Sequence, residues 1–392
     1  MTMPPTKPQR DEGVSPVIGA IFVIAFSTVS VLVTLYWGLP LIDEMKAVSE
    51  YKGVGNQFTE LQAQLQDLSS GAAVNTAKRW DPALSRGTVT IREGTQRWAI
   101  QTDEHLTNRV YLKDAMGDTG TFKLGFRAGM TNWNVTPTQD YLYVEAVRVA
   151  AGQEYPLTVY DETPAAMTRQ GIATATGVWK SFSLKDSLGN DYSFNGQLTK
   201  LTVKKQRSAL CLVDADLCSY EDVATIWLLD MGEVEYSLAA GKAPREVHAL
   251  NGATLKGTTN DLYVANAPSA FTVNTGDASA PRFFARATEI TGGGSYAGET
   301  QFRIVLTLRS TSLLASDERA FGVKVYFEET DEGDAWMDYL VDETNGYGFE
   351  DHRQGIDAYF PAIDPADSFV EHWVGTPFSF TFVHTRVQAG GS

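Results

Sequence analysis

The sequence predicts a long N-terminal α-helix, spanning a membrane and extending beyond it, followed by an all-β ectodomain of one or two β-sandwich-like domains. Three patterns in the 392 residues indicate this fold class. An uncharged, largely apolar run extends from Val14 to Ile42, and apolar residues then recur at helical spacing as far as Leu68. Short stretches of period two begin near Thr88. We therefore expect a helical part over residues 14–70 and a β-rich part over residues 84–392.

The run from Val14 to Ile42 is long enough to cross a bilayer, since about 20 apolar residues suffice for a helix. It exceeds the roughly 7–15 apolar residues of a secretory signal, and no Ala-x-Ala cleavage site follows it. Its hydrophobicity surrounds the helix, which disfavours the alternative of a helix buried in a soluble core. Tyr36 and Trp37 suit a membrane–water interface. We expect residues 14–42 to be a transmembrane helix that stays in the mature protein.

Apolar residues continue beyond the membrane at alternating spacings of four and three, which is the heptad pattern of one helical face. We call this face the helix seam; it consists of Ala47, Tyr51, Val54, Phe58, Leu61, Leu65 and Leu68. We expect residues 43–70 to be an extracellular extension of the same helix. Two alternatives stay open. The seam packs on the chain's own globular domain, or it associates with other copies, and both hold if its two halves differ.

The β-rich part is a series of short alternating stretches separated by turn residues, which is typical of β-sandwiches. Residues 88–91 and 97–100, joined by Arg92-Glu-Gly-Thr95, predict a hairpin. The last candidate strand is Phe378 to His384. A division of this part near residues 211–244 is left open.

Composition excludes some functions. The net charge of −16 and the pI near 4.8 disfavour nucleic acid as a partner, because such binding requires clustered Lys and Arg.

The two cysteines, Cys211 and Cys218, do not form a zinc pattern. On the outside of a cell they predict a short disulfide loop worth about 2–2.5 kcal/mol; the alternative is two separate buried thiols. Asn134 begins an Asn-Val-Thr glycosylation sequon.

The sequence offers no recognisable catalytic constellation. None of the five histidines belongs to an H-E-x-x-H motif, and no G-x-S-x-G elbow is present. We therefore expect no enzyme activity, no cofactor, and no catalytic or metal-binding residue. The densest acidic stretch, residues 328–334, lacks the ligand order of an EF-hand. We expect a solvated loop there, with a loose calcium site as the alternative.

The segment Gly13-Val-Ser-Pro-Val-Ile-Gly-Ala20 resembles the N-terminus of archaeal type IV pilins and pilin-like proteins. The resemblance covers about residues 9 to 42. It implies that residues 1–13 are a leader, or class III signal peptide, removed by a membrane-embedded prepilin peptidase between Gly13 and Val14. The chain differs from the family at Asp11 and Glu12, where Lys or Arg usually stands.

The resemblance also implies that helices from many subunits pack together, as residues 14–42 would in a filament core. Helix packing in lipid relies on small and hydroxyl residues, and the candidates for helix packing are Gly19, Ala20, Ala25, Ser27, Phe58, Leu61 and Leu65. The expected function is a pilin-like structural protein of the archaeal cell surface, forming a filament or serving as a minor, adhesive subunit. Its partners would be the membrane, prepilin peptidase and copies of itself or other pilins. The alternative is a monomeric, single-pass surface binding protein or enzyme.

Overall fold

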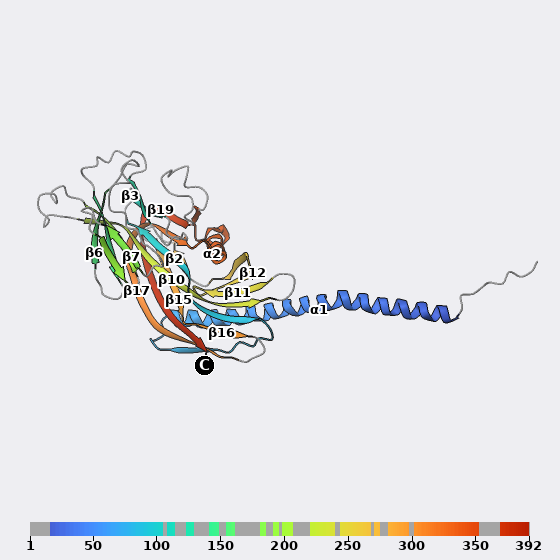
Figure 1. Cartoon of the computed structure of the whole chain (residues 1–392). Helices are drawn as coiled ribbons and strands as arrows, with labels where there is room; N and C mark the ends of the chain where they lie inside the picture. Colours follow the sequence, from blue (N-terminus) through green and yellow to red (C-terminus); the bar gives the residue numbers. More distant parts are fainter. Residues whose placement is uncertain are drawn as a thin grey trace, which may run out of the picture.

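The computed structural model of the chain describes residues 16–104, 108–113, 123–128, 141–148, 154–160, 181–185, 191–195, 198–206, 220–239, 244–267, 270–274, 281–297, 302–352 and 369–391. A long apolar N-terminal helix is followed by a β-rich region, so the predicted fold class is confirmed (Figure 1).

The elements of the first half are α1 (Pro16–Ser69), β1 (Ala77–Trp80), β2 (Thr88–Asp103), β3 (Asn108–Lys113), β4 (Lys123–Ala128), β5 (Tyr141–Arg148), β6 (Glu154–Tyr160), β7 (Ser181–Lys185), β8 (Asp191–Asn195) and β9 (Leu198–Gln206). The second half contains β10 (Tyr220–Leu238), β11 (Arg245–Leu250), β12 (Ala253–Thr258), β13 (Asp261–Asn266), β14 (Phe271–Asn274), β15 (Arg282–Thr291), β16 (Gly294–Ala297), β17 (Ile304–Phe327), α2 (Asp331–Val341), a 3₁₀ turn (Glu343–Asn345), β18 (Glu350–Asp351) and β19 (Phe369–Gly391).

Helix α1 runs without interruption through Pro40 and has two different halves. The first half projects away from the β-rich body (Figure 1), and the large apolar side chains between Val17 and Met45 are exposed. The second half lies against the body, where the helix seam is buried except for Tyr51, which is partly buried. The two halves of one helix therefore have different surroundings, although both are built from apolar residues.

Hydroxyl groups in the projecting half bond within the helix. Thr28 donates to the carbonyl of Ile24 at 2.8 Å, and Thr34 donates to that of Ser30 at 2.7 Å. A polar group needs such an internal partner wherever water is absent. These two threonines are therefore compatible with an apolar environment around the helix.

The described strands form one 15-stranded sheet and two two-stranded hairpins, β3–β4 and β7–β8. The main path of the large sheet is β13-β12-β11-β10-β2-β17-β19-β15-β14. Neighbours along this path are antiparallel except β15 and β19, which are parallel. β10 pairs with β2, β9 and β11, so the described sheet is continuous across much of the range considered for a domain division.

Two cores lie along this sheet. The α1 core joins the helix seam to Trp80, Leu84, Val89, Ile91, Val234, Tyr236, Leu238, Val247, Ala249, Ile290, Ile304, Leu306, Leu308, Val387 and Ala389. The α2 core contains Trp98, Ile100, Trp227, Leu229, Met231 and their neighbours, with Trp336 of α2 edge-on to Trp98 at 5.2 Å between ring centroids. Strands β2, β10, β17 and β19 contribute residues to both cores. The α1 core and the α2 core are therefore joined by shared strands.

The predicted hairpin over residues 88–100 is wrong, because these residues form the single strand β2. Arg92 pairs with Glu233 and Gln96 pairs with Met231, so residues 93–95 stand opposite Gly232 alone, as a bulge. Gly232 is needed there, since a Cβ would lie 2.0 Å from the carbonyl oxygen of Ile290. The turn-like residues therefore interrupt the pairing of β2 with β10 without reversing the chain.

The prediction of a solvated loop over residues 328–334 is also wrong in part, because helix α2 begins at Asp331. Thr330 caps the helix by accepting a hydrogen bond from the Gly333 amide at 3.2 Å. Acidic residues in the first turn stabilise a helix because they interact with its positive N-terminal end. Trp336 and Leu340 are buried on the inner face of α2. The acidic residues thus begin a packed helix.

Candidate functional site

Most of the exposed large apolar side chains among the described residues lie on the projecting half of α1. It is long and apolar enough to cross a membrane. The predicted packing residues Ala20, Ala25 and Ser27 are exposed on it, and Gly19 is partly exposed. Exposed apolar surface of this extent marks a membrane or protein contact.

The other predicted packing residues, Phe58, Leu61 and Leu65, are fully buried against the chain's own sheet. Phe58 meets Trp80 edge-on, with ring centroids 5.2 Å apart. A buried side chain of this size contributes about 1.5–3 kcal/mol from removal of apolar surface. Of the two alternatives for the helix seam, packing on the chain's own domain is therefore the one observed.

Polar contacts fix the same half of α1 to the body. Gln57 is bonded at both ends of its amide, donating to the Ala83 carbonyl at 3.1 Å and accepting from the Ala83 amide at 2.8 Å. Gln62, which the heptad pattern places off the seam, is buried and bonded to Asn266 and Thr254 at 3.1 and 2.9 Å. Satisfied amides of this kind favour one orientation of the attached half of α1 on the body.

Ion pairs add to this attachment where the helix leaves the body. Arg86 lies 3.0 Å from Asp43, and Arg245 lies 2.8 Å from Glu44. Glu50 accepts a hydrogen bond from the Ser85 amide at 2.7 Å. These groups lie just beyond the uncharged run, so they mark the boundary between the exposed apolar half of α1 and its attached half.

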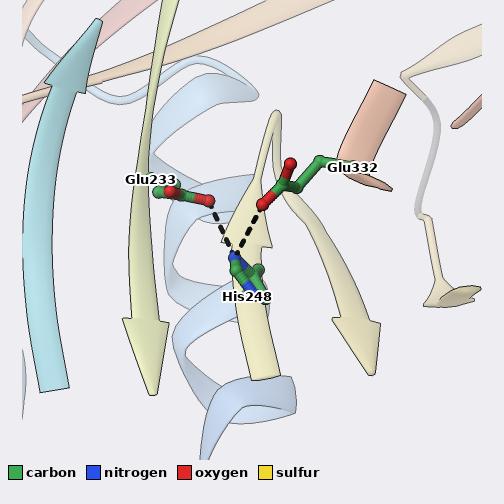
Figure 2. A group of neighbouring side chains, drawn as sticks. All are labelled: Glu233, His248 and Glu332. Carbon is green, nitrogen blue, oxygen red and sulfur yellow. Dashed lines mark hydrogen bonds and ion pairs between the residues drawn. The ribbon is translucent and has the colours of Figure 1, made fainter. Parts of the chain in front are cut away.

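A polar cluster occupies the opposite face of the sheet from α1. Cross-strand pairing places Glu235 of β10 opposite His248 of β11, and Arg92 of β2 opposite Glu233. Because strand side chains alternate, Glu233, Glu235, Glu246 and His248 share one face. Val234 and Val247 point the other way, into the α1 core. Glu332 of α2 covers the cluster (Figure 2).

The two nitrogens of His248 face different carboxylates. Nδ1 lies 2.8 Å from Oε2 of Glu233 and 3.7 Å from Oε1 of Glu332. Nε2 has no hydrogen-bond partner among the described residues and lies 3.5 Å from Oε2 of Glu246. The residue as a whole is 2% exposed. Figure 2 shows Glu233 and Glu332 reaching the same edge of the ring from two different elements.

The pKa values of three groups in this cluster, those of His248, Glu246 and Glu235, are shifted. Burial by itself lowers the pKa of His248, but the neighbouring carboxylates of Glu233 and Glu246 outweigh burial and raise it to about 10. His248 in turn lowers the pKa of Glu246. Burial raises the pKa of Glu235 despite the nearby Arg92. The cluster therefore attracts positive charge strongly.

Two other buried ion-pair groups lie along the sheet. Lys324 is fully buried beside Asp103 and lies 3.3 Å from Glu371. Glu289 accepts two hydrogen bonds from Arg386, both at 3.1 Å, and lies 3.0 Å from His384. Burial opposes ionisation of Glu289, but His384 and Arg386 outweigh it and lower its pKa.

Several predicted site residues lie outside the described residues. They are Gly13 and Val14 at the proposed cleavage point, Asn134 in the sequon, and Cys211 and Cys218 of the proposed disulfide. These stay predictions.

Sequence reasoning missed the cluster around His248. A signal was present in the alternation of Glu233-Val-Glu235 and Glu246-Val-His248, which places four ionisable side chains on one face of two adjacent strands. The register of β10 on β11 and the arrival of Glu332 from α2 are tertiary features that no spacing reveals.

Comparisons with protein-family models, with curated proteins and with solved structures found no match to this chain. The site is therefore interpreted from its own geometry.

Proposed function

We propose that this chain is a pilin-like structural protein of the archaeal cell surface. The exposed half of α1 would anchor it in the membrane as a single pass and then assemble with other copies into a type IV pilus-like filament. The observation that carries the proposal is the division of one continuous helix into an exposed apolar half and a half fixed to the β-rich body. The resemblance of residues 9–42 to archaeal pilins supports the same function.

The physical argument concerns where the apolar surface goes. The side chains from Val17 to Met45 cannot stay in water at this extent, since each buried CH₂ is worth about 0.8 kcal/mol. Before assembly the bilayer would cover them, with the β-rich body outside the cell. In a filament, neighbouring helices would cover them, with Gly19 and Ala20 allowing close approach. The size of the body favours a minor or adhesive subunit.

A second function has its own support. The helix seam is buried within the chain, so outside the membrane this face of α1 is not available to another copy. A monomeric, single-pass surface binding protein needs no further contact between copies. It is the alternative to be tested.

Electron microscopy of sheared cell surfaces, with an antibody against the β-rich body, separates these functions. We expect filaments labelled along their length or at their tips. A Gly19→Leu variant should reduce filament yield without changing membrane insertion, because Leu blocks close helix approach. Val23→Leu is the matched control, since Val23 is also exposed on the projecting half and the change keeps it apolar.

Dispersed membrane labelling without filaments would overturn assembly and favour the anchored monomer. Intact-mass measurement tests the leader separately. We expect a mass beginning at Val14, and a mass beginning at Met1 would overturn the processing step.

A further inference from the structure

The cluster around His248 brings together ligand atoms from three elements. Glu233 comes from β10, His248 from β11 and Glu332 from α2, and one ligand atom from each lies within 4.8 Å of the others. Figure 2 shows the two carboxylates converging on one ring nitrogen. A convergence of imidazole and carboxylate groups at this range is the donor set of many metal centres.

The distances suit an ion between these atoms. Nδ1 of His248 lies 2.8 Å from Glu233 Oε2 and 3.7 Å from Glu332 Oε1. Adjacent ligands of a tetrahedral ion with bonds of about 2.0–2.1 Å are separated by about 3.3 Å. The two observed separations bracket that value. Nδ1 of His248 and Oε2 of Glu233 are joined by a hydrogen bond, which an ion would replace after shifts of about half an ångström at these two contacts.

The negative charge of the cluster also favours the binding of a cation. Glu233, Glu235, Glu246 and Glu332 place four carboxylates around one imidazole. Among the described residues, the cationic side chains paired with these carboxylates are Arg92 and His248 alone. Glu233 and Glu235 are 2% and 7% exposed, so their charges are largely removed from water. Buried negative charge that lacks enough cationic partners destabilises the folded protein. A divalent ion would supply the missing positive charge.

Outer groups already orient the candidate ligands. Gln96 donates to Oε2 of Glu332 at 3.0 Å, which leaves Oε1 directed at His248. Thr259 donates to Oε1 of Glu246 at 2.7 Å, so its other oxygen faces Nε2 of the ring. In metal sites, a carboxylate beside the second ring nitrogen fixes the orientation of a ligating histidine. Glu246 is placed for that role.

We propose that Glu233, His248 and Glu332 bind one divalent transition-metal ion, of the zinc or manganese class, which ties α2 to strands β10 and β11. Calcium fits less well because it takes oxygen ligands, whereas this set includes an imidazole nitrogen. The proposal departs from the sequence expectation that no histidine binds metal. It is independent of filament assembly, since the cluster lies on the face of the sheet away from α1.

The test uses the full chain, purified in detergent without an affinity tag. The protein is treated with a chelator, desalted, equilibrated with Zn²⁺ or Mn²⁺, desalted again and analysed by elemental mass spectrometry. We expect about one zinc per chain and a higher melting temperature with zinc than with chelator, since an ion that binds only the folded state stabilises it. A Glu332→Gln variant should bind zinc at least tenfold more weakly, because loss of an outer-shell group alone costs about 10–100-fold.

Asp331→Asn is the matched control. It removes a neighbouring carboxylate of the same helical turn, one that accepts a hydrogen bond from the Asn260 amide and is not part of the cluster. Both variants keep Cys211 and Cys218, so zinc held by thiols would not distinguish them. Equal zinc content in the unmodified chain and Glu332→Gln, or equal loss in both variants, overturns the proposal. An unmodified chain with the same melting temperature in zinc and in chelator also overturns it, whether or not the variants fold.

Discussion

Truncating Phe58 to alanine tests whether the helix seam belongs to the core of its own chain. The side chain is fully buried between α1 and the sheet and meets Trp80 edge-on. If the contact is intramolecular, its loss must destabilise a single chain. If the seam were instead a contact between copies, the cost would appear in association.

The expected magnitude follows from the burial. Phe-to-Ala changes in a core cost about 3–5 kcal/mol. The edge-on pair with Trp80 places Phe58→Ala in the upper part of that range, because such pairs add about 0.5–1.5 kcal/mol beyond area burial. Domains unfold with about 5–15 kcal/mol. The variant should therefore lose about a quarter or more of the stability of the body.

Guanidinium unfolding of the full chain in detergent, followed by tryptophan fluorescence, measures this loss. The matched control is Phe26→Ala, which removes the same side chain from the same helix where it is 69% exposed. We expect the control to unfold within about 0.5 kcal/mol of the unmodified chain.

Two results would refute the reasoning. A loss below about 1 kcal/mol for Phe58→Ala would mean that Phe58 is not in the core. A midpoint that rises with protein concentration only in the unmodified chain would mean that the seam joins copies.

Three further outcomes follow from the packing of the sheet. Gly232→Ala should cost about 1–3 kcal/mol in thermal unfolding, because its Cβ would lie 2.0 Å from a carbonyl oxygen; Gly293→Ala, with open space around it, should change little. Lys324→Met should cost about 3–5 kcal/mol, since it removes the ammonium group that lies beside two buried carboxylates, and adding Asp103→Asn should recover part of the loss. The pKa of Glu289 is lowered in the folded state, so its stabilising effect is present above its unfolded pKa of about 4.3 and is lost as the pH falls through the folded value. Guanidinium unfolding of Glu289→Gln should therefore show a deficit at pH 7 that shrinks toward pH 3, and a deficit independent of pH would contradict the role of its charge.

The sequence by itself determined where the long helix lies. It also determined that the first half of this helix is apolar all round, whereas the second half has a single apolar face. The uncharged run to Ile42 and the heptad spacing to Leu68 are local, because helical periodicity depends only on residues three and four apart. The same holds for the β-rich character of the rest. Periodicity did not say what covers the seam, since a heptad face fits a sheet of its own chain as well as another helix.

Only the tertiary structure decided the features that depend on distant residues. Turn-like residues near Gly94 form a bulge in β2 because β10 continues past them on its neighbouring edge. Glu332 reaches His248 because α2 packs beside the sheet, 84 positions farther along the chain. Strand register and helix docking are set by the fit of whole faces. The cluster of Glu233, His248 and Glu332 is therefore a consequence of the folded chain: strand alternation indicates the faces on which Glu233 and His248 lie, but no spacing in the sequence links either residue to Glu332.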